Sequence, residues 1–413
     1  MMPSYIFENA RIVDGSNEDG EHDRFVRVSG NVIDEVSDKP IRDSNAHRFD
    51  LRGKTLMPGL IDCHVHINSG VADPAENSFL PNELVAYHSV RILKGMLNRG
   101  FTTVRDLGGA TVAQVHAIEQ GLIEGPRLVI CGKAMVQTGG HSDYRTRYDM
   151  ISGDRQLDQL GSVGRIVDGV DDCRRAARDE VRKGARFIKV MANGGAASSH
   201  FPRPYLGYSM DELRAFQDEA DKAKMYVSVH THTDEAVARA LECGIHSIEH
   251  ATLITPQTAA TAAKQGAIVT PTIAAYEAQI READALKLDP GFVERLKWVR
   301  ARGPESLETM RAAGVKLAYG TDVLGSMHSY QSEEFLIRAE ALPAIEVIKS
   351  ATLTAAELVR MEGKVGAIAA GAFADLLVVD KDPVKDLSAL GSQGRYMSAI
   401  MKDGAFVKNQ LAA

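Results

Sequence analysis

Cysteine and tryptophan are scarce in this chain of 413 residues, which contains four of the first and one of the second. The cysteines are Cys63, Cys131, Cys173 and Cys243. They lie far apart and show no CxxC spacing, which argues against a structural zinc site built from cysteines. We therefore expect reduced thiols and a cytoplasmic protein.

Long apolar runs and an excess of positive charge are also missing. No run of about 18 apolar residues occurs, and no basic segment followed by an apolar one opens the chain, so we expect neither membrane spanning nor secretion. The formal net charge is -7 and the pI is near 6.0, with lysine and arginine scattered along the chain. Nucleic acid is therefore not an expected partner. With 44% hydrophobic and 25% charged residues, the chain reads as globular.

Strand-like and helix-like segments alternate through the middle of the chain. Short apolar β-like runs recur between amphipathic helical stretches, such as 209–223, where Ser209 and Glu212 form a capping box. The runs are 59–66, 101–107, 127–132, 185–192, 226–232, 247–251, 267–272 and 316–322. Eight β/α units predict an α/β fold, a (β/α)8 TIM-like barrel.

Both ends of the chain show strand patterning instead. Short β-like runs fill residues 3–56, and strand patterning returns at 372–380 and 396–407. We expect the two termini to form one small β-sandwich domain beside the barrel. The predicted boundaries are 1–57 and 366–413 for the β-sandwich and 58–365 for the barrel.

Several of the strand-like runs end in residues that can bind a metal. The segment PGLIDCHVH at 58–66 places His64 and His66 two positions apart, on one face of a strand. Four later runs contribute further candidates, which are Lys189, His230, His250 and Asp322. Taken singly, His230, His250 or Asp322 is explained equally well as a hydrogen-bonded structural residue. Because the C-terminal ends of barrel strands face one pocket, their joint placement predicts a two-metal hydrolase.

Lys189 shares its strand parity with two large apolar residues, Phe187 and Met191. A buried ammonium without a partner costs several kcal/mol, and burial lowers the pKa of the amine. A neutral amine can capture carbon dioxide as a carbamate, whose two oxygens can each hold one metal. The alternative is a lysine paired with an acid such as Asp106.

Five segments together resemble the amidohydrolase superfamily in its binuclear, carboxylated-lysine form. They are PGLIDCHVH, FIKVMANGG, VHTH, IEHA and YGTD. Within that superfamily, the chain is most similar to the Xaa-Pro dipeptidase-like and imidazolonepropionase-related group, which includes ochratoxinase-like amidases. The segments that carry this likeness are 102–109, 137–141, 191–199 and 321–335.

The resemblance implies a complete metal site and a mechanism. His64, His66 and Asp322 would hold one divalent metal, His230 and His250 would hold the other, and carboxylated Lys189 would bridge both. Zinc is the first expectation, although manganese, cobalt or iron suit the same ligands. Such a metal pair acidifies a bridging water. Asp322 would then be the catalytic residue that carries a proton to the leaving amine.

Candidates for substrate contact are less sharply defined. His141 resembles a position that meets the substrate's carboxylate or the oxyanion in this group, and a loop hydrogen bond is its alternative. His232 shares the strand parity of His230, and His328 lies in the loop after Asp322. The long loop after the fourth strand adds Arg203, Tyr205 and Tyr208, for which a surface loop is an equal explanation.

These features predict a small-molecule or dipeptide-like substrate with an amide or peptide bond next to a free carboxylate. The first expectation is Xaa-Pro or other C-terminal dipeptides, followed by N-acyl amino acids and ochratoxin-like amides. The alternatives are a one-metal deaminase or imidazolone hydrolase, for which His232 and Glu235 supply an HxxE pattern, and a non-catalytic assembly barrel. We also expect a homo-oligomer.

Overall fold

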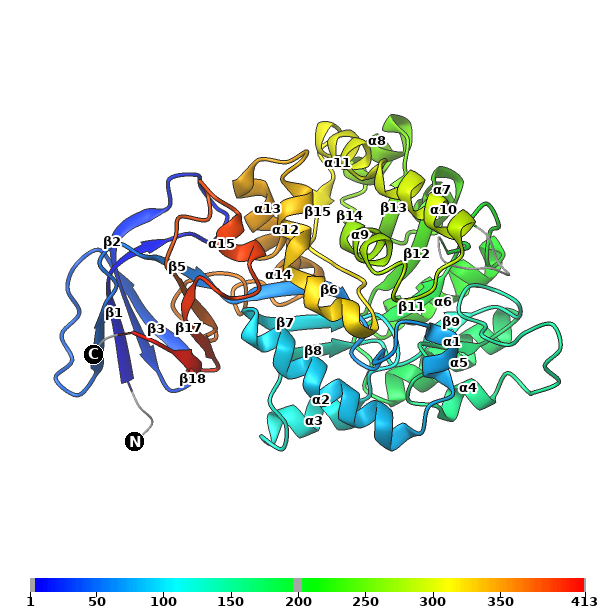
Figure 1. Ribbon diagram of the computed structural model, residues 1–413, viewed down its shortest axis with the longest axis horizontal. Coiled ribbons are helices and arrows are strands. Elements are labelled where there is room, and N and C mark those ends of the chain that lie inside the picture. The colour runs from blue at the N-terminus through cyan, green and yellow to red at the C-terminus, as the bar shows by residue number, and fades with distance from the viewer. Residues whose placement is uncertain (1–3, 196–202, 412–413) are drawn as a thin grey trace.

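The computed structural model describes residues 4–195 and 203–411, so residues 196–199 of the glycine-rich segment 191–199 lie outside the described residues. A strand-rich part lies at one side of the molecule and a larger part with strands and helices at the other (Figure 1). Both chain ends lie in the strand-rich part. Within the described residues, no helix is both long and apolar enough to span a bilayer.

Strands from both ends of the chain form one eight-stranded sheet, in the order β18-β17-β16-β5-β1-β2-β3, with β4 paired to β1. The central pairing joins β5 to β16 antiparallel, with Met57 opposite Leu377. The strands are β1 (Ser4–Ile12), β2 (Glu21–Ser29), β3 (Val32–Ser37), β4 (His47–Asp50), β5 (Thr55–Pro58), β16 (Leu376–Val379), β17 (Met397–Lys402) and β18 (Ala405–Asn409). Their inward side chains form an apolar cluster that includes Phe7, Val26 and Leu376.

The larger part contains two sheets in which every pairing is parallel, with the orders β6-β7-β8 and β10-β9-β11-β12-β13-β14-β15. The strands are β6 (Leu60–Val65), β7 (Phe101–Asp106), β8 (Arg127–Ile130), β9 (Ala134–Val136), β10 (Gly164–Ile166), β11 (Ile188–Met191), β12 (Val227–Thr233), β13 (Ser247–Leu253), β14 (Ile268–Thr270) and β15 (Lys316–Leu317). Each of the eight predicted runs overlaps one of these strands, although β12 and β13 extend one and two residues past the predicted ends. The short β9 and β10 were not predicted, because three residues show no readable periodicity.

Backbone hydrogen bonds connect the two parallel sheets at two places. The Cys63 N–H donates to the Tyr319 carbonyl at 2.8 Å, which joins β6 to the segment after β15. The Arg186 N–H donates to the Ile130 carbonyl at 2.8 Å, which joins β8 to the segment before β11. The fold is therefore a mixed α/β arrangement in which the first strand of the larger part lies beside the segment that follows its last strand.

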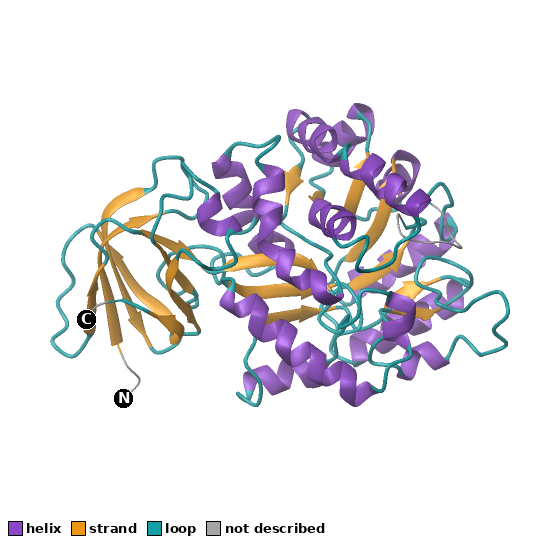
Figure 2. Cartoon of the chain, in the orientation of Figure 1, coloured by secondary structure: helices purple, strands orange, loops and turns teal. Residues whose placement is uncertain are grey.

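Helices lie around the parallel strands (Figure 2). They are α1 (Pro74–Ser78), α2 (Asn82–Asn98), α3 (Val112–Glu119), α4 (Arg155–Asp158), α5 (Val170–Arg182), α6 (Met210–Lys222), α7 (Asp234–Glu242), α8 (Pro256–Lys264), α9 (Ile273–Arg281), α10 (Pro290–Arg300), α11 (Gly303–Ala312), the 3-10 helix η1 (Gly325–Glu333), α12 (Glu334–Arg338), α13 (Ala344–Ser350), α14 (Leu353–Leu358) and α15 (Ser388–Gly391). The predicted capping box is present at the start of α6, where the Ser209 hydroxyl accepts the Glu212 N–H.

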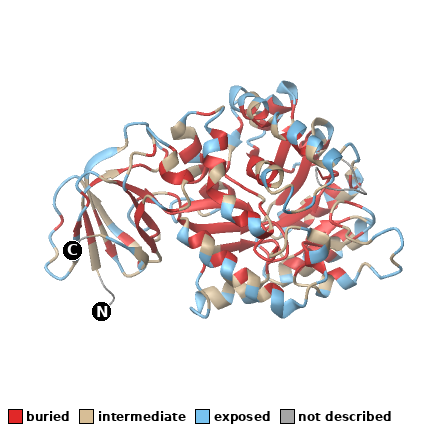
Figure 3. Ribbon diagram, viewed as in Figure 1, coloured by how far each residue is buried: buried red, intermediate tan, exposed pale blue. Residues whose placement is uncertain are grey.

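Most of the parallel strands are buried on both faces, whereas the helices expose their outer faces (Figure 3). β6 and β7 are buried at every position, as expected for strands covered by helices. The four cysteines are buried and form no disulfide, in agreement with the prediction of reduced thiols. Because burial removes polar groups in this core from water, they need hydrogen-bond partners within the protein.

Candidate metal centre

All six predicted metal ligands come together at the ends of the parallel strands. Five of them line one cavity of about 280 Å³, and these are His64, His66, Lys189, His230 and Asp322. The sixth, His250, contacts this wall through its Nε2, which lies 2.9 Å from His230 Nδ1. Residues from five different strand regions thus share one small volume.

Two of these ligands, His250 and Asp322, have an unusual backbone conformation. His250 and Asp322 have φ values of 69° and 55°, in the left-handed region that residues other than glycine seldom adopt. In a regular strand, Glu249 and His250 would face opposite sides. Because the backbone of β13 turns to a positive φ at His250, both residues contact His64. Such strained backbone is frequent at functional sites.

Two imidazoles converge on the Asp322 carboxylate. His64 Nε2 and His66 Nε2 lie 3.4 and 3.3 Å from Asp322 Oδ1. The opposite ring nitrogens are already engaged, because His66 Nδ1 lies 3.2 Å from the Gly108 carbonyl and His64 Nδ1 lies 2.8 Å from Glu249. Burial alone would raise the pKa of Asp322, but the two histidines hold it well below its usual range. The carboxylate is therefore ionised, as a metal ligand must be.

His230 and His250 form a second pair. Besides its contact with His230, His250 places Nδ1 2.7 Å from Thr272 Oγ1. His230 Nε2 is buried and has no hydrogen-bond partner among residues 4–195 and 203–411. Burial, together with neighbouring imidazoles, holds the pKa values of both rings well below the usual value for histidine. Both rings are neutral near pH 7, which is the form that binds metals.

Lys189 has the surroundings expected of a lysine that is not an ordinary ammonium. Its side chain is 1% exposed, and Nζ has no hydrogen-bond partner in the described part of the chain. Burial lowers its pKa to about 8. The predicted alternative, a pair with Asp106, is wrong, because the Asp106 carboxylate accepts the backbone N–H groups of three loop residues, Ile67, Gly108 and Ala110.

The donor atoms fit divalent metal ions. Ligand atoms of His64, His250 and Asp322 lie within 4.8 Å of one another, as do those of His230, His232 and His250. Imidazole nitrogens and carboxylate oxygens are the ligands that zinc accepts. The unpartnered Lys189 Nζ and His230 Nε2 are polar atoms that burial would otherwise penalise. The residues present therefore fit a metal site at this cavity.

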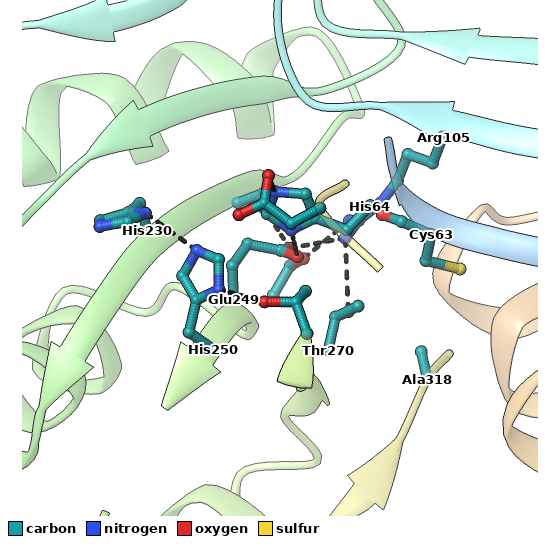
Figure 4. A network of polar contacts seen from close by, with 12 residues as sticks. Cys63, His64, Arg105, His230, Glu249, His250, Thr270 and Ala318 are labelled. Atoms are coloured by element: carbon teal, nitrogen blue, oxygen red, sulfur yellow. Dashed lines mark hydrogen bonds and ion pairs between the residues drawn. The ribbon is translucent and has the colours of Figure 1, made fainter. Parts of the chain in front are cut away.

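Sequence reasoning missed two residues, Arg105 and Glu249, which form a buried polar group next to the ligand His64 (Figure 4). Both side chains are fully buried, and Arg105 Nη2 lies 2.5 Å from Glu249 Oε1. Burial would raise the pKa of Glu249, but Arg105 and His64 lower it below its usual range. The available signal was a charged residue inside each of two apolar strand runs, Arg105 in FTTVRDL and Glu249 in HSIEHA.

Two of the predicted substrate contacts line the cavity. The His141 ring stacks on His230 with 4.4 Å between ring centroids, and burial lowers the pKa of His141 to about 4. His232 Nδ1 lies 3.1 Å from Thr252 Oγ1, and burial lowers the pKa of this ring to about 3. Several polar residues that were not predicted also line the cavity, among them Tyr144, Tyr276 and Gln279.

The other four predicted contacts do not line the cavity. His328 is buried and its Nε2 lies 3.2 Å from the Ser69 carbonyl. The Tyr208 hydroxyl donates to the Val167 carbonyl at 3.1 Å, so it points into the fold. Arg203 lies over the ring of Trp298, 5.0 Å from its centroid. Tyr205 is 55% exposed.

Comparison with known proteins identifies the family. The model of the amidohydrolase family matches residues 55–407. A prolidase solved in complex with N-methylphosphonate-L-proline is 42% identical, with 98% of this chain and 100% of that chain covered and a TM-score of 0.96. A Xaa-Pro dipeptidase with bound methionine in its active site is 28% identical, with 98% and 100% covered and a TM-score of 0.85.

A curated relative from Aspergillus niger gives the same result. Its ochratoxinase is 27% identical over 412 residues, which cover 94% of this chain and 82% of the relative. The chain belongs to the amidohydrolase family. It is a hydrolase that acts on carbon–nitrogen bonds.

Proposed function

We propose that this protein is a binuclear metal-dependent amidohydrolase that cleaves an amide or peptide bond next to a free carboxylate. The preferred substrates are Xaa-Pro or other C-terminal dipeptides, followed by N-acyl amino acids and ochratoxin-like amides. The larger part of the chain is proposed to be a closed (β/α)8 barrel, since backbone hydrogen bonds join β6 to the segment after β15 and β8 to the segment before β11.

The observation that carries the proposal is the isolation of Lys189. Its buried Nζ shares a cavity wall with His64, His66, His230 and Asp322, and no described residue offers it a hydrogen bond. A lysine carbamate changes this cation into an anion with two ligand oxygens. That group would bridge two metals, held on one side by His64, His66 and Asp322 and on the other by His230 and His250.

The protein's own residues then have distinct tasks. When bound, a metal pair of this kind acidifies a water molecule and polarises the substrate carbonyl. Asp322 takes a proton from the attacking water and delivers it to the leaving amine nitrogen, which its place between the His64 and His66 rings allows. The His141 ring stacks on His230 at the cavity wall. From there its neutral imidazole donates a hydrogen bond to the substrate's carbonyl oxygen or to its carboxylate.

Two observations favour a substrate with a free carboxylate. The cavity presents several neutral donors beyond the ligand cluster, among them His232 and Tyr276. The prolidase relative was solved with N-methylphosphonate-L-proline, a compound with such a carboxylate. Its sequence identity of 42% over 98% of this chain is consistent with a related substrate class here.

The deaminase alternative has weaker support. Its HxxE pattern requires Glu235 to act at the site together with His232. Glu235 is exposed in the first turn of α7, whereas His232 is buried at the cavity. Glu235, the acid of that pattern, therefore lies outside the cavity in which it would have to act.

A kinetic screen tests the proposal. The purified 413-residue chain, supplied with zinc and bicarbonate, is assayed on Xaa-Pro and other dipeptides and on N-acyl amino acids. The same compounds are also assayed with the carboxylate converted to an amide. We expect turnover of the free acids, much less of the capped forms, and two metal ions per chain by elemental analysis. One metal per chain with deamination activity would contradict the proposal.

A further inference from the structure

Glu249 is a buried carboxylate that touches the metal ligand cluster without being one of its expected ligands. Its two oxygens contact different partners. Oε2 lies 2.8 Å from His64 Nδ1, and Oε1 lies 2.5 Å from Arg105 Nη2. The Ser228 hydroxyl donates to Oε1 at 2.6 Å. Glu249 thus joins the ligand His64 to a buried cation.

Arg105 is itself held in place. Its Nε donates to the Cys63 carbonyl at 2.6 Å, and Nη1 donates to Ser247 Oγ at 3.0 Å. Because Cys63 directly precedes His64, the same guanidinium fixes both the backbone before the ligand and the carboxylate behind its ring (Figure 4). Strands β6, β7 and β13 are therefore connected through one group of buried polar contacts.

We propose that Glu249, kept in place by Arg105, is a positioning residue for the metal centre. The carboxylate accepts the Nδ1–H of His64 and so fixes the tautomer in which the Nε2 lone pair faces Asp322 and the cavity. A carboxylate behind a histidine ligand also makes the imidazole a better donor. This inference rests on the proposed function, because it requires the metal site that His64 helps to form.

Zinc affinity, measured by competition with a chromophoric chelator, tests the role. In Glu249→Gln, the amide must present its N–H groups to His64 or to Arg105, both of which are donors. We expect zinc binding that is about 10–100-fold weaker, the range found when such outer partners of ligands are changed. The visible absorption of the cobalt-loaded protein reports on ligand geometry, and we expect it to change as well.

A second variant separates positioning from plain stability. Arg105→Met/Glu249→Leu removes both members of the buried ion pair, so no unpaired charge remains and the protein is expected to fold. If Glu249 only stabilises the fold, zinc affinity returns to the wild-type value. If Glu249 positions His64, affinity stays reduced although the melting temperature recovers.

The chain supplies a matched control in another buried ion pair. Glu334 and Arg338 are both fully buried, with Arg338 Nε 2.8 Å from Glu334 Oε1, and neither contacts a predicted ligand. Glu334→Gln is expected to lower the melting temperature while zinc affinity stays near wild type. Wild-type zinc affinity in both Glu249 variants would overturn the positioning role of Glu249 but leave the proposed function standing. If the wild-type protein itself bound no zinc, the proposed function would fail together with it.

Discussion

Asp322 combines an unusual backbone with an unusual charge environment. Its φ is 55°, and its carboxylate lies between the Nε2 atoms of His64 and His66. The side chain is thereby held in one orientation in the absence of substrate. A group held in this way is suited to accept a proton at one stage of a reaction and to return it at another.

Asp322→Asn tests this role. The amide keeps one oxygen for metal binding but accepts no proton, so we expect most of the metal to remain and kcat to fall by at least about 100-fold. Metal content per chain and kcat on the best dipeptide are the measurements. A variant with near wild-type turnover would refute the shuttle.

Lys189 gives a prediction about pH. Carbon dioxide reacts with the neutral amine, and burial lowers the pKa of Lys189 to about 8. The neutral fraction therefore rises as the pH rises through this value, whereas an ordinary lysine would stay charged. We expect metal-free protein to regain activity with zinc and bicarbonate faster at about pH 8.5 than at about pH 7.

Labelled bicarbonate identifies the modification directly. With 13C-bicarbonate and zinc, the wild-type protein should show one carbamate carbon signal by NMR. Lys189→Met has a side chain of similar length but no amine, so we expect neither this signal nor full metal content. A Lys189→Met protein that binds two metals and retains activity would rule out the bridge.

At the scale of the elements, the site depends on how closely the segment after β15 approaches β6. Gly320 lies at this approach. A Cβ added there would lie 2.3 Å from Thr270 Cγ2 and 2.9 Å from His64 Cβ. Only a residue without a side chain fits between β14 and the strand that carries the first ligand.

Gly320→Ala is therefore expected to displace His64. Overpacking of this kind typically costs about 1–3 kcal/mol, which urea denaturation would measure, and zinc affinity should fall as well. Thr270→Ser removes Cγ2 but keeps the hydroxyl, so the double variant Gly320→Ala/Thr270→Ser should regain part of the loss. If Gly320→Ala bound zinc normally, the tight approach would have no role in the site.

At the scale of the whole molecule, Arg127 connects the two parts. It begins β8, and its Nη1 donates to Asp375 Oδ2 at 2.6 Å while Nη2 contacts Asp403. Its guanidinium also lies over the Phe373 ring, 4.3 Å from the centroid. These acidic partners belong to the C-terminal segment that completes the eight-stranded sheet.

Arg127→Met removes the charge but keeps an apolar stem. Asp375 is almost fully buried and would lose its cation, so we expect a loss of about 2–4 kcal/mol in the free energy of unfolding. Lys94→Met is the matched control, since Lys94 and Glu124 are both largely exposed, and should change stability by less than about 0.5 kcal/mol. Equal effects of the two variants in urea denaturation would show that Arg127 does not connect the parts.

Most of the strands and all of the candidate metal ligands could be predicted from the sequence. The eight β-like runs each overlap a strand, and the six residues proposed as ligands were found from the ends of those runs. Both succeeded because they rest on local signals: apolar periodicity sets a strand, and an ionisable residue at the end of an apolar run stands out by contrast. The two short strands β9 and β10 gave no such signal.

Tertiary structure alone decided which side chains meet. Arg105 and Glu249 lie 144 positions apart and form their ion pair only because β7 and β13 face the same interior. The left-handed backbone at His250 and Asp322, and the absence of Tyr208 from the cavity, likewise depend on packing between distant strands. Sequence patterns report the environment of each residue along its own strand, whereas contacts across the interior are set by the register and twist of all the strands together.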